Sequence, residues 1–424
     1  MSNTRGRRIG VLATAVTVIL GLSACAGTTA APVSLPDQPT AEMASGSTEV
    51  LDAALAEAMA LSASSGAIAG VWAPWSGSWV SAAGTTAPGG SEKMTTDMRF
   101  RIGDNTKPMT CDVLYALAEE GTVALDDEVS TYLPSIIGLD DITLEQLCHG
   151  TSGIGDYSAT LGSSFAVNPT RQWSPVELIS DGIARPRTGT PGEAYASSDT
   201  NYVLLGLALE EATTTEWDEL YQRYVFDRLS MENSFFPEPT TLAISGPFAP
   251  GWAINKAADG TLACDAPSDL TELSNSQAFT AGGVVSTIDD MHTYAQSFAT
   301  AALVPDEVGT EAWKTVPLSA DAPAWQGFGP GGLQMGPLRG QMGSIPGHIS
   351  AMFSDPTTGL TVVVMLNNST AGAGFARLVA MKLAAIAAKA PPVDGEKLPA
   401  VGLPWSEEQM TEQLAAAAVC QPAA

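Results

Sequence analysis

The feature that most constrains this chain is a junction between a short strand and a helix in its first third. Residues 98–103 alternate in polarity as half-buried strands do, and an apolar run typical of a helix spans residues 113–120. Asp104 and Lys107 lie between them, three positions apart. Residues at i and i+3 share a helix face, so we expect these two side chains to meet where the helix begins.

The composition and net charge of the chain limit its domain size and the partners and cofactors that it can bind. The chain has 424 residues, of which 45% are hydrophobic and 15% charged, enough for a sizeable core in one large or two medium domains. A formal net charge of −27 repels phosphates and argues against nucleic acid as a partner. His149, His292 and His348 are far apart with no Cys-x-x-Cys nearby, so the sequence predicts no metal site and no cofactor.

The junction has a chemical meaning in enzymes that acylate a serine. A lysine one helical turn after the serine can remove the hydroxyl proton and so activate the nucleophile. Here Lys107 is present, but the residue one turn before it is Asp104. The sequence therefore indicates the scaffold of a serine acyl enzyme with a carboxylate at the nucleophile position.

The motif at residues 100–107, Phe-Arg-Ile-Gly-Asp-Asn-Thr-Lys, resembles the Phe-x-Ile-Gly-Ser-x-Thr-Lys of the serine β-lactamases and penicillin-recognising D,D-peptidases. It is most similar to the branch that holds class C β-lactamases and related esterases. Segments 121–127, 142–153 and 281–287 also resemble that family. The resemblance implies an α/β (α+β) fold, with an antiparallel sheet flanked by helices and a second, mostly helical lobe.

A second family motif departs from its usual residues at Ser197-Ser198-Asp199. Relatives carry Tyr-x-Asn here, where the tyrosine relays a proton to the leaving group and the asparagine binds substrate and lysine. A serine hydroxyl can also relay a proton, so Ser197 is compatible with that role. Asp199 removes an amide donor and adds negative charge close to Asp104.

The third motif departs at Gln341, where relatives have a histidine or lysine that faces the nucleophile across the cleft. Gln341 is neutral and is followed by Gly343, which matches a family glycine. His348 lies one residue after the family's Pro-Gly, and strand alternation does not return it to the missing position. The resemblance implies one catalytic-type cleft, formed by Asp104, Lys107, Ser197, Asp199, Gln341 and Gly343.

These departures favour binding over catalysis. An Asp104–Lys107 ion pair would keep the lysine protonated, and an ester or amide attacked by a carboxylate gives an anhydride that reverts. We therefore expect a non-catalytic domain that binds a peptidoglycan fragment, a small ester or amide, or a partner protein. The alternative is an active hydrolase (a D,D-carboxypeptidase, β-lactamase or esterase) in which Ser197, Ser198 or Thr106 attacks with Lys107 as base. A third interpretation takes the C-terminal tail as the functional part.

The first residues indicate export. Three arginines precede an apolar run that is too short to span a bilayer, as in a signal peptide over residues 1–24. The run ends in Leu-Ser-Ala-Cys, which resembles the bacterial lipobox and makes Cys25 the expected lipidated residue. A Thr-, Ala-, Pro- and Ser-rich tether over 25–47 would hold the domain on the extracellular face of the cell membrane. An ordinary secretory signal is the alternative for this segment.

The remaining cysteines are even in number, as expected of disulfides outside the cytoplasm. Four cysteines allow three connectivities, and we favour Cys111–Cys148 with Cys264–Cys420 over buried free thiols. The resemblance places Cys148 just before a turn that borders the region of Lys107. The expected domain spans 48–390, divided into an α/β lobe (48–105 and 275–390), a helical lobe (106–274) and a C-terminal tail (391–424).

Overall fold

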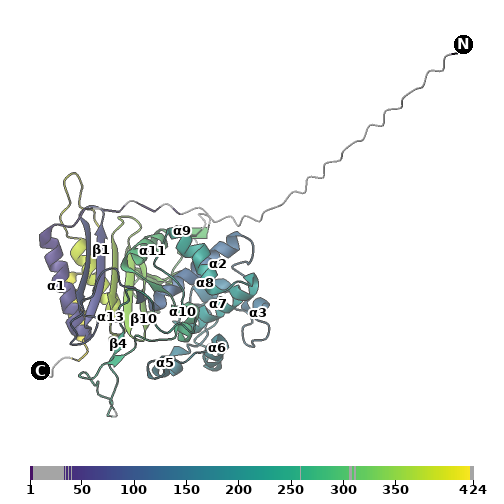
Figure 1. Cartoon of the computed structure of the whole chain (residues 1–424), viewed down its shortest axis with the longest axis horizontal. Coiled ribbons are helices and arrows are strands. Elements are labelled where there is room, and N and C mark those ends of the chain that lie inside the picture. The colour runs from purple at the N-terminus through teal and green to yellow at the C-terminus, as the bar shows by residue number, and fades with distance from the viewer. Residues whose placement is uncertain are drawn as a thin grey trace.

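The chain folds around one sheet with helices on both sides (Figure 1). The structure is a computed structural model that describes residues 1–2, 33, 35–36, 38–39, 41–257, 259–304, 308–309 and 312–420. The expected signal peptide, apart from its first two residues, lies outside the described residues, as do Cys25 and residues 26–32, 34, 37 and 40 of the tether. Across the described ranges, no helix is both long and apolar enough to cross a membrane.

The sheet has eight strands, and each hydrogen-bonded pair is antiparallel. It joins the two ends of the domain, because Ala67 of the first strand pairs with Leu366 of the last. In spatial order the strands are β2 (Gly77–Gly84), β1 (Gly66–Ala73), β12 (Thr361–Leu366), β11 (His348–Ser354), β10 (Leu338–Ile345), β9 (Leu333–Met335), β8 (Gln326–Phe328) and β7 (Val316–Pro317). The expected antiparallel sheet flanked by helices is confirmed.

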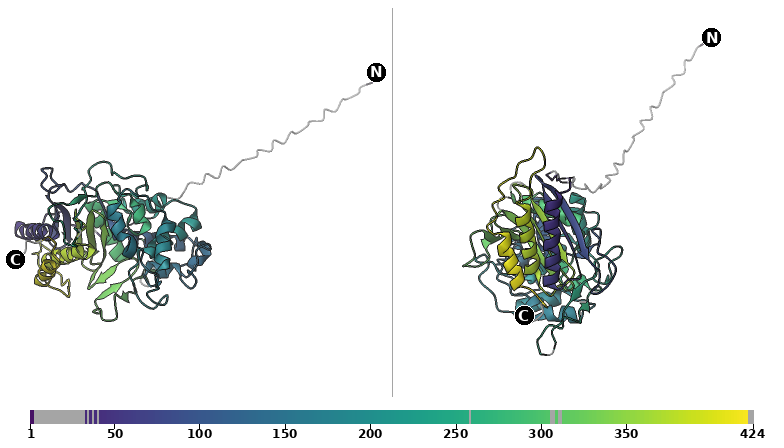
Figure 2. Two further views of the ribbon diagram at one scale, coloured as in Figure 1. Left: turned by 90° about the horizontal axis from the view of Figure 1, so that it is seen from below. Right: turned by 90° about the vertical axis from the view of Figure 1, so that its left-hand side faces the viewer.

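Alternation along the central strands divides the core into two layers. In β1, Ala69 and Val71 belong to one hydrophobic cluster, while Ile68 belongs to the other. The first cluster is covered by α1 (Ser45–Ser62), α13 (Ala373–Ala387) and α14 (Glu407–Ala416), which lie side by side in front of the sheet in the right view of Figure 2. The second is covered by α11 (Ile288–Thr300) and the helical lobe. Both faces are buried, which explains the nearly continuous apolar runs of β1 and β12.

The helical lobe follows the sheet's first two strands and contains the junction. The junction itself is a two-residue strand followed by a 3₁₀ turn and a helix, and further along the lobe a π-helical segment, η2, interrupts a helical stretch. The lobe's elements are β3 (Phe100–Arg101), η1 (Gly103–Asn105), α2 (Thr106–Glu119), α3 (Val129–Tyr132), α4 (Leu144–Cys148), α5 (Ser158–Val167), α6 (Pro175–Ala184), α7 (Asp199–Thr213), α8 (Trp217–Tyr221), η2 (Gln222–Phe226), α9 (Asp227–Leu229), β4 (Trp252–Ala253), β5 (Ser268–Asp269), η3 (Asn275–Gln277), α10 (Phe279–Gly282) and β6 (Val285–Ser286).

Both ends of the domain extend beyond the expected bounds. At the start, Met43 is buried and its N–H donates to Ser78 O at 2.9 Å, so packing begins inside the expected tether. At the end, α14 packs on α13, and the Trp405 indole donates to Met381 O at 2.9 Å. The segment expected as an extra tail therefore belongs to the folded domain.

The structure contains both of the favoured disulfides. One joins Cys111 to Cys148 and so links α2 to α4. The other joins Cys264 to Cys420 and so attaches the end of the described chain to the loop between β4 and β5. Each covalent link closes a long loop, which lowers the entropy of the unfolded chain.

We expect Trp405→Ala to lower the free energy of unfolding by about 3 to 5 kcal/mol, as deletion of a large buried aromatic does. Trp405 is buried, packs against Trp325 and loses its hydrogen bond to Met381 in the variant. Urea unfolding of the purified protein measures the loss. Leu398→Ala, at an exposed position of the same segment, is the matched control and should change stability little. Equal stability of both variants would contradict a packed C-terminal segment.

Candidate active site

The site is organised by the ammonium of Lys107, which lies between two carboxylates. Its Nζ is 3.0 Å from Oδ1 of Asp104 and 2.6 Å from Oδ1 of Asp199. Lys107 is only 6% exposed, and its Nζ also lies 5.3 Å from the centre of the Tyr202 ring. The expected pair of Asp104 with Lys107 is thus present, and Asp199 joins it from the start of α7.

A tight 3₁₀ turn places Asp104 just before the first residue of α2. Gly103 has φ +56°, and a Cβ there would lie 2.7 Å from the backbone N of Ser344, so only glycine fits. Asn105 is fully buried and fixes the turn by donating to Ile102 O at 3.1 Å and to Ser350 Oγ at 2.8 Å. The turn therefore packs directly against the strands β10 and β11.

The backbone of β10 supplies a donor to the Asp104 side chain. Ser344 N–H donates to Asp104 Oδ2 at 3.1 Å. Gly343 permits this approach, because a Cβ there would lie 2.1 Å from Ile102 O. In acyl transfer, a backbone N–H directed at the nucleophile position can stabilise an oxyanion. Here this N–H already donates its hydrogen bond to the Asp104 carboxylate.

The backbone of Asp199 is fixed by Asp156, a residue that sequence reasoning missed. The N–H of Asp199 donates to Asp156 Oδ1 at 3.2 Å. Asp156 follows the Thr-Ser-Gly turn and lies in a loop, where neither periodicity nor a motif could have indicated it. Ser198 is buried and donates to Gly155 O at 3.1 Å, whereas Ser197 is exposed and borders the cleft.

Gln341 does not supply charge to the cleft. Its Nε2 donates to Gly331 O at 2.7 Å, and its Oε1 accepts from Met342 N–H at 2.9 Å. The side chain is neutral, buried and fixed on both sides by backbone groups.

The histidines do not replace the missing cation. His348 is buried and hydrogen-bonds Ala249 O at 2.8 Å, and burial lowers its pKa to about 4.

The remaining two histidines also lie outside the cleft. His149 shares a 3.1 Å hydrogen bond with Tyr115, and burial lowers its pKa to about 4. His292 stacks on Trp72 with ring centres 3.9 Å apart, and burial lowers its pKa to about 3. Within the described ranges, no group of three or more histidine, cysteine, aspartate or glutamate side chains is arranged to hold a metal ion.

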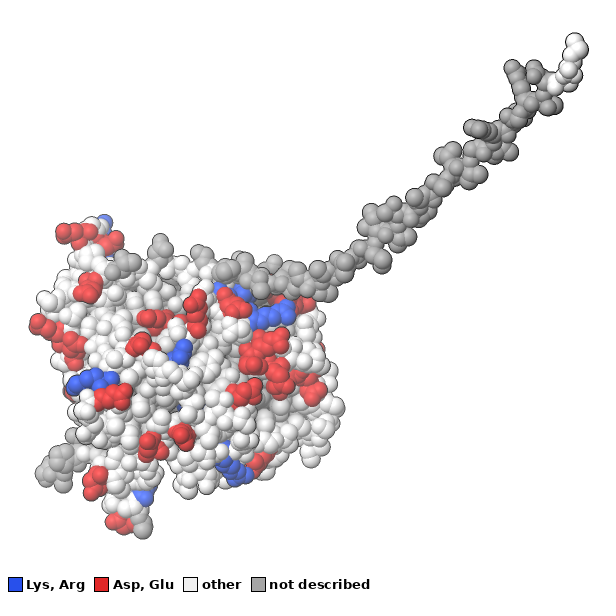
Figure 3. Space-filling view, in the orientation of Figure 1, with Lys and Arg blue, Asp and Glu red and all other residues white. Residues whose placement is uncertain are grey.

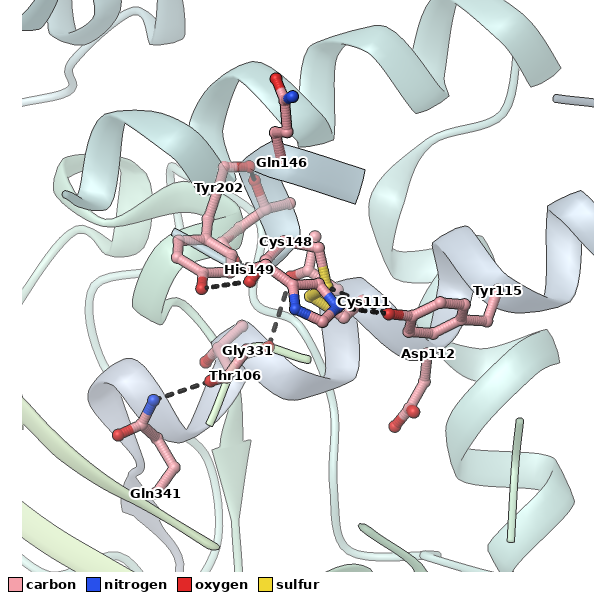
Figure 4. The surroundings of a disulfide bond; sticks show 12 residues. Thr106, Cys111, Asp112, Tyr115, Gln146, Cys148, His149, Tyr202, Gly331 and Gln341 are labelled. Atoms are coloured by element: carbon pink, nitrogen blue, oxygen red, sulfur yellow. Dashed lines mark hydrogen bonds between the residues drawn. A yellow bond between two sulfur atoms is a disulfide. The ribbon is translucent and has the colours of Figure 1, made fainter. Parts of the chain in front are cut away.

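A chain of hydrogen bonds to backbone carbonyls links the first disulfide to the cleft (Figure 4). Cys148 O accepts from Tyr202 OH at 2.9 Å and from Gly331 N–H at 3.1 Å. Gly331 O in turn accepts from Gln341. The disulfide to Cys111 thus anchors a carbonyl that positions groups on opposite sides of the cleft.

The two carboxylates of the cluster prevent Lys107 from acting as a general base. Burial alone would lower the pKa of Lys107, but the carboxylates of Asp104 and Asp199 hold it well above its usual value. Burial, with repulsion from Asp199, raises the pKa of Asp104 to about 6 although Lys107 lowers it. Lys107 therefore stays protonated at neutral pH and cannot accept a proton from a nucleophile.

The cluster opens into two cavities. The smaller, about 70 Å³, is bordered by Asp104, Lys107, Ser197 and Gln341, as the sequence predicted for the cleft. The larger, about 490 Å³, lies on the side of Asp199 and Asp156. Both are in contact with Asp104 and Lys107.

Comparison with known proteins agrees with the fold. The family described as Beta-lactamase matches residues 51–386, most of the chain, so the chain belongs to that family. It therefore carries a β-lactamase-related serine hydrolase domain.

Curated relatives match over shorter segments. A D-aminopeptidase of Cereibacter sphaeroides is 32% identical over 145 residues, which cover 33% of this chain and 27% of that protein. The putative penicillin-binding protein PbpX of Bacillus subtilis is 28% identical over 137 residues, 32% of each chain. The matches thus span about a third of these relatives.

Solved structures share the fold over most of the chain. A D-stereospecific amidohydrolase from Streptomyces sp. is 25% identical with a TM-score of 0.65, over 78% of this chain and 95% of that one. A D-amino acid amidase from Ochrobactrum anthropi SV3 is 22% identical with a TM-score of 0.65, over 78% and 92% of the two chains. These likenesses establish the β-lactamase and penicillin-binding-protein fold.

The raised pKa of Asp104 predicts a pH dependence of stability. Its folded value of about 6 exceeds its ordinary value of 3.8, so the folded state binds the proton more tightly. This contribution to stability is complete below pH 4 and is lost as pH rises through about 6. Urea unfolding at several pH values should show a shallower decline from pH 4 to 7 in Asp104→Asn than in the native protein. Asp126→Asn, at an exposed carboxylate, should keep the native slope; an unchanged slope in Asp104→Asn would refute the assignment.

Proposed function

We propose that this domain binds a ligand in the old active-site cleft without forming an acyl-enzyme at residue 104. The observation that carries the proposal is that both oxygens of the Asp104 carboxylate already have partners within the chain. One oxygen pairs with the Lys107 ammonium, and the other accepts the N–H of Ser344. The groups that would activate a nucleophile and stabilise an oxyanion are therefore both occupied by the chain itself.

Chemical reactivity supports the same proposal. A carboxylate that attacked an ester or amide would form an anhydride, which returns readily to reactants. The protonated Lys107 donates hydrogen bonds but does not take up a proton. A peptidoglycan fragment, a small amide or ester, or a segment of a partner protein would therefore be held without turnover.

Intact-mass spectrometry after incubation with a penicillin and with a fluorophosphonate tests this proposal. The native protein should gain no mass. Asp104→Ser should gain an adduct slowly, because its hydroxyl meets a lysine that is still paired with Asp199. The double variant Asp104→Ser/Asp199→Asn should react at least about tenfold faster, since loss of the second carboxylate favours the neutral amine.

The matched control for this series is Asp199→Asn alone, which lacks a hydroxyl at residue 104 and should remain unmodified there. A stable adduct on the native protein would overturn the binding proposal. Peptide mapping of that adduct would then name the nucleophile.

The comparisons favour a second candidate, an active hydrolase with a displaced nucleophile, since several relatives carry the names of peptidases and amidases. Ser197 is the hydroxyl best suited to it, because it is exposed and borders both cavities with Lys107, and its side-chain hydrogen bond is to Tyr195, which also lines the smaller cavity. The other two candidates are engaged elsewhere: Ser198 donates to Gly155 O, and Thr106 Oγ1 accepts from Val284 N–H at 3.2 Å. Modification of the native protein at Ser197, lost in Ser197→Ala, would establish this alternative.

We also propose that Cys25 is lipidated and holds the domain on the extracellular face of the cell membrane. The support is the lipobox-like Leu-Ser-Ala-Cys at residues 22–25 after a basic, then apolar, segment. In the bacterial host, the native chain should fractionate with membranes, and Cys25→Ala should shift to the soluble or secreted fraction. Cys264→Ala, which keeps the lipobox, is the control. Membrane fractionation of Cys25→Ala equal to that of the native chain would contradict the anchor.

A further inference from the structure

The described residues within 33–43, here called the strap, pack against the domain ahead of α1. At one end the strap pairs with the start of β2, where Ser78 N–H donates to Ala41 O at 2.8 Å and Met43 N–H donates to Ser78 O at 2.9 Å. Gly77 permits this approach, because it has φ +112° and a Cβ there would lie 2.6 Å from Ala41 O. Met43 is buried, so this end of the strap belongs to the packed domain.

The other end of the strap reaches α9. Between the two ends, Gln38 Oε1 lies 3.4 Å from Nε2 of His292 on α11. Val33 and Leu35 are partly buried against the hydrophobic core. Val33 N–H also donates to Arg228 O at 2.9 Å. The strap therefore contacts the domain from β2 to α9.

The strap and the cleft lie at opposite ends of the central strands. Pro36 and Gln38 border a cavity of about 230 Å³ together with the turn that follows β11, residues 355–359. The larger cleft cavity instead borders Pro346, before β11, and Ser369, after β12. Because β11 and β12 are antiparallel strands of seven and six residues, these ends are about 20 Å apart. In Figure 1, α9 lies at the top of the molecule and α5, which borders the cleft cavity, at the bottom.

The strap shortens the chain between the proposed anchor and the domain. Residues 26–32 separate Cys25 from Val33, so the Cα atoms of these two residues are at most about 29 Å apart. A compact domain of this size is about 50 Å across. With lipid on Cys25, the strap side stays near the bilayer, and the chain is too short for the cleft side to be turned onto it. The tether expected over 25–47 would have been long enough for either orientation.

The turn beside the strap carries little exposed charge. Acidic side chains predominate on the face in Figure 3, and a net charge of −27 is repelled by anionic lipid headgroups. The cavity beside the strap is lined by neutral side chains except for Asp355, which is 1% exposed. Its carboxylate accepts from Thr357 N–H at 2.8 Å and from Thr358 Oγ1 at 2.6 Å. This part of the surface can therefore approach headgroups with little electrostatic cost.

We propose that the strap side of the domain faces the lipid bilayer and that the cleft opens away from it. The inference rests on the lipid anchor at Cys25 proposed above and gives that anchor a fixed orientation. The partner of the strap side is the headgroup surface of the membrane. The cleft is then open to ligands that arrive from the side facing away from the membrane, and closed to groups embedded in the lipid.

Energy transfer from a dye on the lipidated full chain to acceptor dyes on lipid headgroups tests the orientation. Thr357→Cys carries the dye on the strap side, and Ser163→Cys carries it on α5 at the cleft side; both positions are exposed. The four cysteines after Cys25 are in disulfides and do not react with a maleimide dye. In vesicles of phosphatidylethanolamine and phosphatidylglycerol, transfer should be at least about twofold stronger from Thr357→Cys, since the two sides differ by about 20 Å in height. Equal transfer, or stronger transfer from Ser163→Cys, would overturn the orientation.

Two changes in the labelled chains separate the strap from the anchor. Leu35→Asp places a carboxylate at a partly buried apolar position, so it should release this part of the strap and reduce the difference between the two labels. Leu398→Asp makes the same substitution at an exposed position and should keep the difference. Insertion of about 20 Gly and Ser residues between residues 31 and 32 should also reduce it, because the chain can then span the domain. An undiminished difference after the insertion would contradict the role of the short chain.

Hydrogen exchange on the full-length Cys25→Ala chain tests the strap without lipid. The amides of Val33 and Met43 should exchange more slowly than those of an unstructured chain, because both donate to backbone carbonyls. Fast exchange at both amides would overturn the strap, whether or not Cys25 carries lipid. Failure of the native chain to join vesicles, with slow exchange retained, would instead overturn the anchor and the orientation that rests on it, and would leave the packing of the strap in place.

Discussion

The interaction on which the rest of the site depends is the sharing of one buried ammonium by two carboxylates. Lys107 reaches Asp104 on the 3₁₀ turn before α2 and Asp199 at the start of α7. A buried ammonium without partners would lose its proton or destabilise the fold, so each carboxylate is also a structural partner. Because Asp104 in turn accepts from Ser344 of β10, the cluster joins the helical lobe to the sheet.

The three departures from the family motifs are consistent with one another physically. The carboxylates of Asp104 and Asp199 repel each other, and both attract the ammonium of Lys107, which therefore remains protonated. The neutral Gln341 avoids a second buried cation and bonds to Gly331 O, which the disulfide-linked Cys148 helps to hold through the N–H of Gly331. Lys107, Asp104 and Gln341 are thus each held by partners within the chain, which favours a preorganised binding cleft over a nucleophile with a free base.

The family resemblance implied the sheet and the helical lobe, and helix spacing predicted the Asp104–Lys107 pair, because motifs and helix spacing are local properties of the sequence. The helix α2 begins at Thr106, close to where the expected pairing of Asp104 with Lys107 required it. The apolar run alone, from Val113, would not have shown this start, because Pro108 lies in the first turn, where proline is tolerated. Asp156, Ser344 and Gln277 could not be predicted as neighbours. They belong to a loop, the end of a strand and a one-turn 3₁₀ helix, and only the tertiary fold brings them to one cavity.

The raised pKa of Asp104 follows from the way the cluster is packed. Burial is its largest cause and repulsion from Asp199 adds to it, while the Lys107 ammonium and the N–H of Ser344 stabilise the charged form. The pKa of about 6 shows that burial and repulsion outweigh those two partners, so the charged carboxylate costs the folded domain stability near neutral pH. A structural ion pair would lower the pKa of its carboxyl group. A carboxyl group whose pKa is raised inside a cleft is instead typical of a functional site, which agrees with a cleft kept for a ligand.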